Sequence, residues 1–214
     1  MQTPITLILL GDIAAGKGTQ AKLIVKKFGL HLVDVGAYTR RILTGRSKVG
    51  IRLSQTKIGK LAPSDIIQQY LKAEITKITP REGILLDGGK MPAEAKLIYR
   101  GLLSKKRKIL VIYLKISRAE TFRRLKWRYY CANTGRPLVI KNAEKKCPHC
   151  GGKIIKRADD DANAIKNRID YYDKIYSKTV EFWKGLGLLK FVNGKQSAKD
   201  VTEDILKIIA DYYQ

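Results

Sequence analysis

The most constraining feature of the sequence is a glycine-rich segment between an apolar run and an amphipathic helical pattern. Residues 5–10 form a short, continuous apolar run typical of a buried strand, and residues 17–28 have a helical pattern that Gly29 ends. Between them, residues 11–19 read Gly-Asp-Ile-Ala-Ala-Gly-Lys-Gly-Thr, which matches the pattern G-x4-G-K-[GST] in its required setting. The segment therefore predicts an α/β fold whose first strand–helix turn binds phosphate groups.

The residue types in this segment suit a polyphosphate. Gly11 and Gly16 permit backbone torsions that turn successive N–H groups inward, and the helix N-terminus adds partial positive charge. Lys17 is expected to reach the β- and γ-phosphates, and Thr19 to help hold Mg²⁺. The predicted ATP-binding residues of the segment are Gly11, Ala14, Ala15, Gly16, Lys17, Gly18 and Thr19. The alternative, a turn rich in Gly and Ala that binds nothing, is disfavoured by the strand–loop–helix setting.

Strand and helix patterns alternate along the rest of the chain. The further predicted strands are residues 31–35, 84–87, 109–116 and 188–192. The further predicted helices are residues 64–78, with Ser64 as the N-cap, and 92–103, 160–183 and 197–213. This alternation predicts an α/β fold of the P-loop NTPase type, with a parallel five-stranded sheet covered by helices on both faces. Residues 36–63 predict short helices without a strand, and residues 127–157 a small β insert.

The net charge of the chain is unusually positive. The 214 residues include 43 Lys and Arg against 19 Asp and Glu, a net charge of +24. Such a field attracts anions in general, so weak nucleic-acid association is left open, supported by runs such as residues 105–108, but a solvated lysine surface is favoured. No apolar run approaches the roughly 20 residues of a membrane helix, which predicts no membrane partner and a cytoplasmic location.

The ending of the glycine-rich segment, Gly-Lys-Gly-Thr-Gln, resembles the adenylate kinase family, and the resemblance extends over nearly the whole chain. It implies phosphoryl transfer from Mg-ATP, or another NTP, to AMP, giving ADP. Arg124 and Arg128 are four residues apart and are expected on one helical face, converging on a polyphosphate. The chain also contains a segment that resembles the family's R-x-D-D…R signature, with its residues in the same order: Arg157, Asp159, Asp160 and Arg168.

Phosphoryl transfer asks a protein mainly for positioning and charge neutralisation, which is why arginines and Lys17 are the expected catalytic residues. Asp159 and Asp160 are expected to pair with these arginines and orient them. As acidic residues at the start of the following helix, they would also stabilise its N-terminus. Asp87, similar to the family's Asp-Gly, is the expected magnesium residue beside Thr19. Residues 193–196, ending in Gln196, resemble the loop that reads the ATP base through main-chain atoms.

The expected monophosphate (NMP) site departs from the family pattern. Its residues are Val35, Gly36, Arg40, Ala62, Gly88, Lys90 and Glu94, with Arg157 and Arg168. Val35 stands where the family usually has a hydroxyl residue, Lys90 or Met91 replaces an arginine, and Glu94 replaces the glutamine that reads adenine. A carboxylate only accepts hydrogen bonds, whereas an amide both donates and accepts. We therefore expect relaxed selectivity for the NMP base.

The three cysteines, Cys131, Cys147 and Cys150, are clustered in the predicted β insert. An odd number of cysteines argues against a disulfide framework, and the spacing resembles the zinc-bearing lid of many adenylate kinases. Three thiolates suit a structural Zn²⁺, with the fourth ligand left open between Thr134, His149 and a water. A lid with ordinary buried cysteines and no metal is the alternative.

The expected organisation is a core of residues 1–35, 64–126 and 159–214, an NMP-binding lobe at 36–63 and a lid at 127–158. The expected partners are the nucleotides ATP, AMP and ADP, and a homo-oligomer is left open. The nearest alternative enzyme is a UMP/CMP-type or broad nucleoside monophosphate kinase. The alternative of another class is a basic zinc-ribbon protein that binds nucleic acid under a nucleotide switch.

Overall fold

The structure, a computed structural model, describes residues 4–43, 47–55, 61–134, 137–140, 146–156 and 162–213, apart from the side chains of residues 162–164, 167, 168, 171 and 172. A parallel sheet of five strands lies at its centre, in the order β2-β3-β1-β4-β8. The strands are β1 (Thr6–Gly11), β2 (His31–Asp34), β3 (Ile84–Asp87), β4 (Ile109–Lys115) and β8 (Leu189–Asn193). All five predicted strands are confirmed, with bounds that differ by no more than one residue. The three inner strands, β1, β3 and β4, contain continuous apolar runs, as expected of parallel strands buried on both faces.

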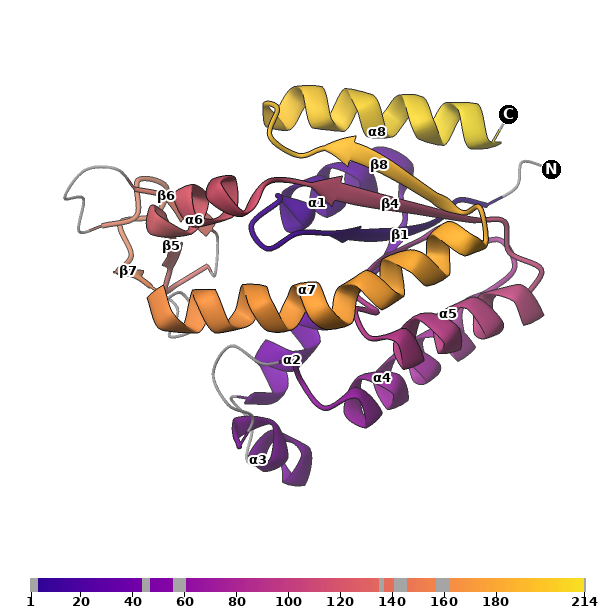
Figure 1. Cartoon of the computed structure of the whole chain (residues 1–214), viewed down its shortest axis with the longest axis horizontal. Coiled ribbons are helices and arrows are strands. Elements are labelled where there is room, and N and C mark those ends of the chain that lie inside the picture. Colours follow the sequence, from indigo (N-terminus) through magenta and orange to yellow (C-terminus); the bar gives the residue numbers. More distant parts are fainter. Residues whose placement is uncertain are drawn as a thin grey trace.

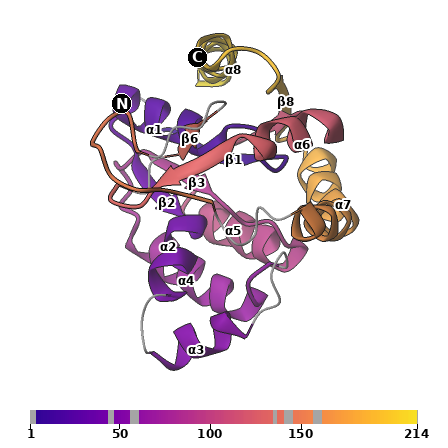
Figure 2. The ribbon, with the colours of Figure 1, turned by 90° about the vertical axis from the view of Figure 1, so that its left-hand side faces the viewer.

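Helices cover both faces of this sheet, as predicted (Figure 2). The helices α1 (Lys17–Phe28) and α8 (Ala198–Tyr213) pack on one face, against residues such as Leu7 and Leu9. The helices α4 (Ser64–Lys77), α5 (Pro92–Ser104) and α7 (Ala162–Gly185) pack on the other, against Ile8 and Leu10. Alternate residues of β1 thus enter two apolar cores, because successive side chains of a strand point to opposite faces. None of the described helices is both long enough and apolar enough to cross a membrane.

The remaining helices are short. The helices α2 (Val35–Leu43) and α3 (Lys48–Ser54) follow β2, and α6 (Arg118–Lys126) follows β4. Val35, which was predicted to end a strand, is the first residue of α2. The predicted N-cap of α4 is also wrong by one position: Pro63 is the N-cap, and Ser64 begins the helix.

The predicted β insert forms a second, antiparallel sheet at one end of the molecule (Figure 1). Its strands are β5 (Arg128–Cys131), β6 (Pro137–Val139) and β7 (Ile154–Ile155), with β5 in the middle. Among the described residues of this insert, the buried apolar cluster consists of Cys131, Leu138, Ile140 and Cys147, with Tyr129 and Ile154 packed against it, and Tyr130 is also buried. So small an apolar core contributes little folding free energy by itself.

The basic run at residues 105–108 is not a continuous charged surface, contrary to the prediction that used it. Arg107 is 7% exposed, and its guanidinium donates from Nε to Thr6 Oγ1 at 2.8 Å and from Nη2 to the Glu82 carbonyl at 2.5 Å. Lys105 Nζ donates to the Ile78 carbonyl at 2.9 Å, just after the last turn of α4. Two members of the run therefore hold the fold together, and the run does not support nucleic-acid binding.

Candidate active site

The glycine-rich segment lies at the carboxyl edge of β1, the central strand, and opens α1. A Cβ on Gly11 would lie 2.5 Å from the Leu114 carbonyl oxygen, so only glycine fits where the loop passes β4. Gly16 is the N-cap of α1 with φ of 95°, a left-handed conformation that favours glycine. Lys17 Nζ donates to the Gly11 and Asp12 carbonyls at 2.6 and 2.8 Å, so its ammonium group lies over the loop.

The other predicted residues of this loop are arranged around the same turn. Ala15 is buried, Ala14 has φ of 62°, and Gly18 and Thr19 are exposed in the first turn of α1. The first turn of α1 contains no acidic residue, so the positive end of the helix is not neutralised there. The loop therefore combines a lysine with a helix N-terminus, which is the arrangement that binds anions.

Three residues that the sequence analysis missed hold this loop from behind. The Asp12 carboxylate accepts hydrogen bonds from the Tyr113 hydroxyl and from the Ile116 backbone N–H, the latter at 2.7 Å. The Tyr176 hydroxyl of α7 accepts from the Gly11 N–H at 3.1 Å, and the Tyr113 and Tyr176 rings lie 5.7 Å apart. A carboxylate inside an anion-binding loop is unfavourable unless it is paired, and this is the signal that could have singled out Asp12.

Asp12→Asn is expected to lower the free energy of unfolding by about 1–3 kcal/mol, because the amide replaces one accepting oxygen by an NH2 group, which cannot accept from the Tyr113 hydroxyl or the Ile116 N–H. Urea denaturation followed by circular dichroism measures the change. Tyr113→Phe removes only one donor and leaves the Ile116 bond, so its effect should be smaller. Equal stability of Asp12→Asn and the wild type would show that the carboxylate does not hold the loop.

The two arginines predicted to share a helical face do not do so. Arg124 lies in α6, but this helix ends at Lys126, so Arg128 lies in β5 instead, 5.6 Å from the centre of the Tyr130 ring. Arg124 donates to the carbonyls of Ala14, at 3.2 Å, and Gly194, at 2.7 Å. It therefore ties the glycine-rich loop to the loop at residues 193–196. Glu120 accepts from Arg124 Nε at 2.6 Å.

Gln196, in the second of these loops, directs its side chain away from the expected ATP site. Its amide donates to Asp204 of α8 at 2.7 Å. The Gln196 side chain is thus engaged with α8, and recognition of the base by main-chain atoms of this loop stays a prediction.

A second group of charged residues lies at the same edge of the sheet, on β2 and β3. Asp34 and Asp87 are register partners at the ends of these strands, and Arg40 Nη2 lies 3.8 Å from Asp34 Oδ2. Burial raises the pKa of Asp87, while the nearby ammonium groups of Lys17 and Lys90 act in the opposite direction. Lys17, in the loop after β1, and Lys90, in the loop after β3, therefore both lie near the Asp87 carboxylate.

The residues of the expected monophosphate site approach one another around Gly88. A Cβ on Gly88 would lie 2.2 Å from Val35 Cγ2, so Val35 packs directly on the glycine. Similarly, a Cβ on Gly36 would lie 2.9 Å from Arg40 Nη1. Ala62 packs against the apolar core that α4 and α5 share. The structure thus brings Val35, Gly36, Arg40 and Gly88 together.

Glu94 has a structural partner that the sequence analysis did not assign. It is 3% exposed, and its Oε2 accepts from the Met91 N–H at 3.1 Å, at the N-terminus of α5. Burial raises the pKa of its carboxyl group, opposed by this hydrogen bond and by one from Ser64. Glutamate at the third position of a helix is a capping signal that the sequence itself contains.

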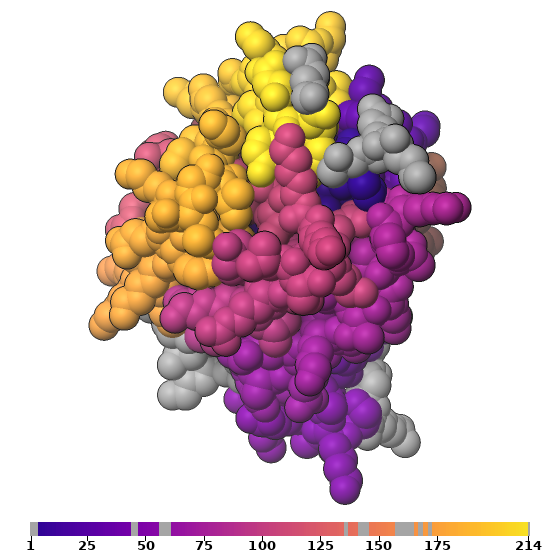
Figure 3. Space-filling model, turned by 90° about the vertical axis from the view of Figure 1, so that its right-hand side faces the viewer, coloured from indigo at the N-terminus to yellow at the C-terminus, as the bar shows by residue number. Residues whose placement is uncertain are grey.

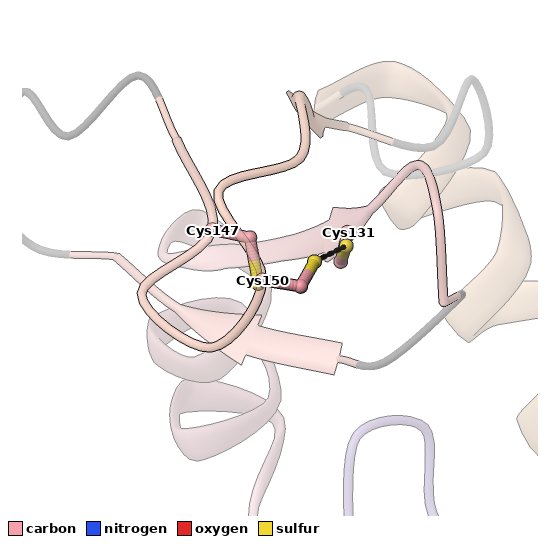
Figure 4. Close-up of side chains that lie close together, drawn as sticks. All are labelled: Cys131, Cys147 and Cys150. Carbon is pink, nitrogen blue, oxygen red and sulfur yellow. Dashed lines mark hydrogen bonds between the residues drawn. The ribbon is translucent and has the colours of Figure 1, made fainter.

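The three cysteines converge in the insert (Figure 4). Their sulfur atoms all lie within 4.8 Å of one another, and those of Cys131 and Cys150 are 3.3 Å apart. His149 is not part of this group, among the His, Cys, Asp and Glu residues that the structure describes. A hydrogen bond from the Thr134 side chain is the largest cause that lowers the pKa of Cys131, to about 6.

Several predicted catalytic residues cannot be placed. Arg157, Asp159 and Asp160 lie outside the described residues. Arg168 lies in α7, but its side chain is not among those described.

A parallel sheet with a glycine-rich anion-binding loop at the carboxyl edge of its central strand defines a P-loop nucleotide-binding protein.

A sequence model described as "Adenylate kinase" matches residues 9–188. Three proteins named adenylate kinase are similar over almost their whole length. That of Clostridium acetobutylicum is 30% identical, covering 96% of this chain and 99% of the relative. Those of Rickettsia africae, at 31%, and Elusimicrobium minutum, at 32%, each cover 95% of this chain, and 98% and 97% of the relatives. The chain belongs to the adenylate kinase family and is a phosphotransferase.

Proposed function

We propose that this protein transfers the γ-phosphoryl group of Mg-ATP to AMP, reversibly, and releases two ADP. The observation that carries the proposal is the adjacency of two cationic groups at one edge of the sheet. Lys17 lies in the loop after β1, and Arg40 and Lys90 follow the neighbouring strands β2 and β3. One group suits the polyphosphate of a donor, and the other suits the phosphate of an acceptor.

In this mechanism the protein positions the two nucleotides and neutralises charge on the transferring group. Lys17 and the N-terminus of α1 bind the donor phosphates, and Arg124 holds the two donor loops together. Arg128, Arg157 and Arg168 are proposed to meet the transferring phosphoryl group, with Asp159 and Asp160 orienting them. Thr19 and Asp87 are proposed to hold Mg²⁺, which when bound neutralises phosphate charge. The exposed hydroxyl of Thr19 and the strand-end carboxylate of Asp87 are oxygen ligands of the kind that Mg²⁺ prefers.

Residues 36–63 are proposed to act as the monophosphate-binding lobe and residues 127–158 as a lid. The lid proposal is supported by the position of β5–β7, which lie apart from the central sheet and directly follow α6 (Figure 1). Closure of both segments over the nucleotides would exclude water, which otherwise competes as the phosphoryl acceptor. A nucleotide kinase of this kind is proposed to act in the cytoplasm.

The monophosphate pocket is proposed to accept bases other than adenine. Support comes from Glu94, because its carboxylate offers no donor when ionised and is engaged with the Met91 N–H. Comparing kcat/KM for AMP, GMP, CMP and UMP tests the proposal. We expect AMP to lead by less than about a thousandfold, since strong discrimination needs buried polar groups that pair with one base only. A larger preference for AMP would contradict relaxed selectivity, although the kinase assignment would stand.

The three cysteines are proposed to hold a structural Zn²⁺. Two sulfurs at about 2.3 Å from one tetrahedral zinc ion lie roughly 3.8 Å apart, and the three sulfurs here all lie within 4.8 Å of one another. Thr134, beside Cys131, or a water is proposed as the fourth ligand in preference to His149. Zinc would supply folding free energy that the few buried residues of the insert cannot.

Removal of zinc tests this role. The purified protein should contain about one zinc per chain, measured by mass spectrometry, and Cys147→Ser should lose most of it. Amide hydrogen exchange in the insert should rise on chelation while exchange in β1 and β4 remains slow. Lys153→Ser, in the same insert, is the matched control and should retain zinc. Metal-free protein with a fully protected insert would contradict the proposal.

A further inference from the structure

A groove runs along the outer surface between α4 and α5, on the face opposite α1 and α8. Its volume is about 600 Å³, which is in the range of ligand-binding clefts. Gly101 lies where the two helices approach closely, since a Cβ there would lie 3.0 Å from Ile75 Cγ2 of the facing helix. Figure 3 shows this side of the molecule, with α4 and α5 in the middle and α7 and α8 beside them.

The residues described along the groove carry only positive charge. Among the described residues, those that line it are Gln68, Lys72, Ile75, Thr76, Ala93, Lys96, Leu97, Arg100, Gly101, Ser104 and Lys105. Four of these residues are cationic and none is acidic. Lys96 and Arg100 are four residues apart on α5, which makes them neighbours on one helical face, and like charges at this spacing are destabilising.

The acidic residues of the two helices are all engaged elsewhere. Asp65 pairs with Arg52 at 2.5 Å, and Glu74 with Lys77 at 2.8 Å. Glu94 is buried at the start of α5. Within the described part of the chain, Lys72, Lys96 and Arg100 are exposed, and their side chains have no ion pair or hydrogen bond. The three cationic side chains are therefore open to an anion from outside the chain.

The distribution of these charges favours a polymer over a small anion. Lys96 and Arg100 are about 6 Å apart along the axis of α5, and Lys72 lies on the facing helix. Cations that are spread over two helices suit the successive phosphates of a strand better than a single phosphate group. Gln68, Thr76 and Ser104 add neutral groups that can hydrogen-bond a sugar–phosphate backbone.

We propose that the groove between α4 and α5 binds the sugar–phosphate backbone of a nucleic-acid strand. Binding is independent of base sequence, because none of the residues described along the groove is aromatic and base stacking is therefore absent. The net charge of +24 adds a general attraction, but the groove determines where the strand lies. None of the residues described along the groove is among those assigned to the two nucleotide sites, so kinase turnover is expected not to depend on it.

The test compares two variants that lose the same charge. The groove variant is Lys72→Gln, Lys96→Gln and Arg100→Gln. The matched control is Lys22→Gln, Lys26→Gln and Lys207→Gln, which removes three exposed lysines of α1 and α8 on the opposite face. Binding of a fluorescent 20-nucleotide oligouridylate is followed by anisotropy between about 50 and 400 mM KCl. Phosphoryl transfer and circular dichroism are measured for each variant.

The groove variant is expected to bind at least about tenfold more weakly than the wild type at low salt. The slope of log K against log salt should fall by about two, since each lost phosphate contact on a single strand contributes about 0.7. The control should remain within about threefold, because only the general field changes. Lys96→Gln alone should show part of the same loss of oligouridylate binding. This single variant replaces the triple variant in the test if the triple variant does not fold.

Four results would overturn the proposal. The first is equal weakening in the groove variant and the control, which would assign binding to net charge alone. The second is no oligouridylate binding by the wild type at low salt. The third is loss of binding in the presence of 1 mM Mg-ATP, about the upper end of ordinary substrate KM values, which would place the strand in the nucleotide site. The fourth is loss of anionic-vesicle binding in the groove variant with oligouridylate binding unchanged.

Discussion

Lys17→Ala is expected to lower kcat by about 10²–10³-fold, the usual effect of removing one preorganised donor from a developing anion. The ammonium group lies over the glycine-rich loop, held by the carbonyls of Gly11 and Asp12. Its loss leaves the helix N-terminus and Arg124 as the nearest described positive groups at the donor phosphates. Steady-state assay of ADP formation, with AMP and Mg-ATP both varied, measures the change.

The fold should survive this substitution, because Lys17 is only partly buried and packs in neither apolar core. The midpoint of thermal unfolding should change by no more than about 2 °C. Lys22→Ala, one turn further along α1 and exposed, is the matched control and should retain wild-type kcat. Turnover near that of the wild type in Lys17→Ala would contradict the assignment of the loop as the donor site.

Arg107→Ala is expected to lower the free energy of unfolding by about 3 kcal/mol, because the hydroxyl and the carbonyls that accept from its guanidinium lose a charged donor. The guanidinium is nearly buried and donates to Thr6 Oγ1 and to the carbonyls of Ile5, Pro80 and Glu82. It thereby joins β1 to the loop that precedes β3. Chemical denaturation of the wild type and the variant measures the loss.

The neighbouring lysine provides the control. Lys106 is exposed, and Lys106→Ala should change the free energy of unfolding by no more than about 0.5 kcal/mol. Arg107→Lys should fall between the two, because an ammonium group keeps the charge but not the planar fork that reaches several acceptors. If Arg107→Ala were as stable as Lys106→Ala, the guanidinium would not be a structural element of the fold.

The fold could be predicted largely from local patterns. The three inner strands, β1, β3 and β4, contain continuous apolar runs because they are buried on both faces, whereas the edge strands β2 and β8 also carry exposed residues. The glycine-rich loop could be predicted because its motif stands between a strand and a helix. The boundaries that failed, at Val35 and Ser64, differ by one residue, which is the usual uncertainty of an element end.

The features that could not be predicted depend on contacts between distant parts of the chain. Tyr113 and Tyr176 reach the loop from 101 and 165 residues away, and no local pattern marks them. Arg107 resembled a solvated charge because its neighbours are lysines, and only the carbonyls around it show otherwise. Arg128 was assigned to a helix by its spacing from Arg124, but α6 ends first and a strand begins.

The most direct test of the central proposal is the rate at which the folded protein forms ADP from Mg-ATP and AMP. We expect turnover of roughly 1–100 s⁻¹, with two ADP for each ATP consumed and a large loss in Lys17→Ala. Absence of transfer to any nucleoside monophosphate, from protein shown to be folded, would contradict the account. The glycine-rich loop would then serve nucleotide binding alone.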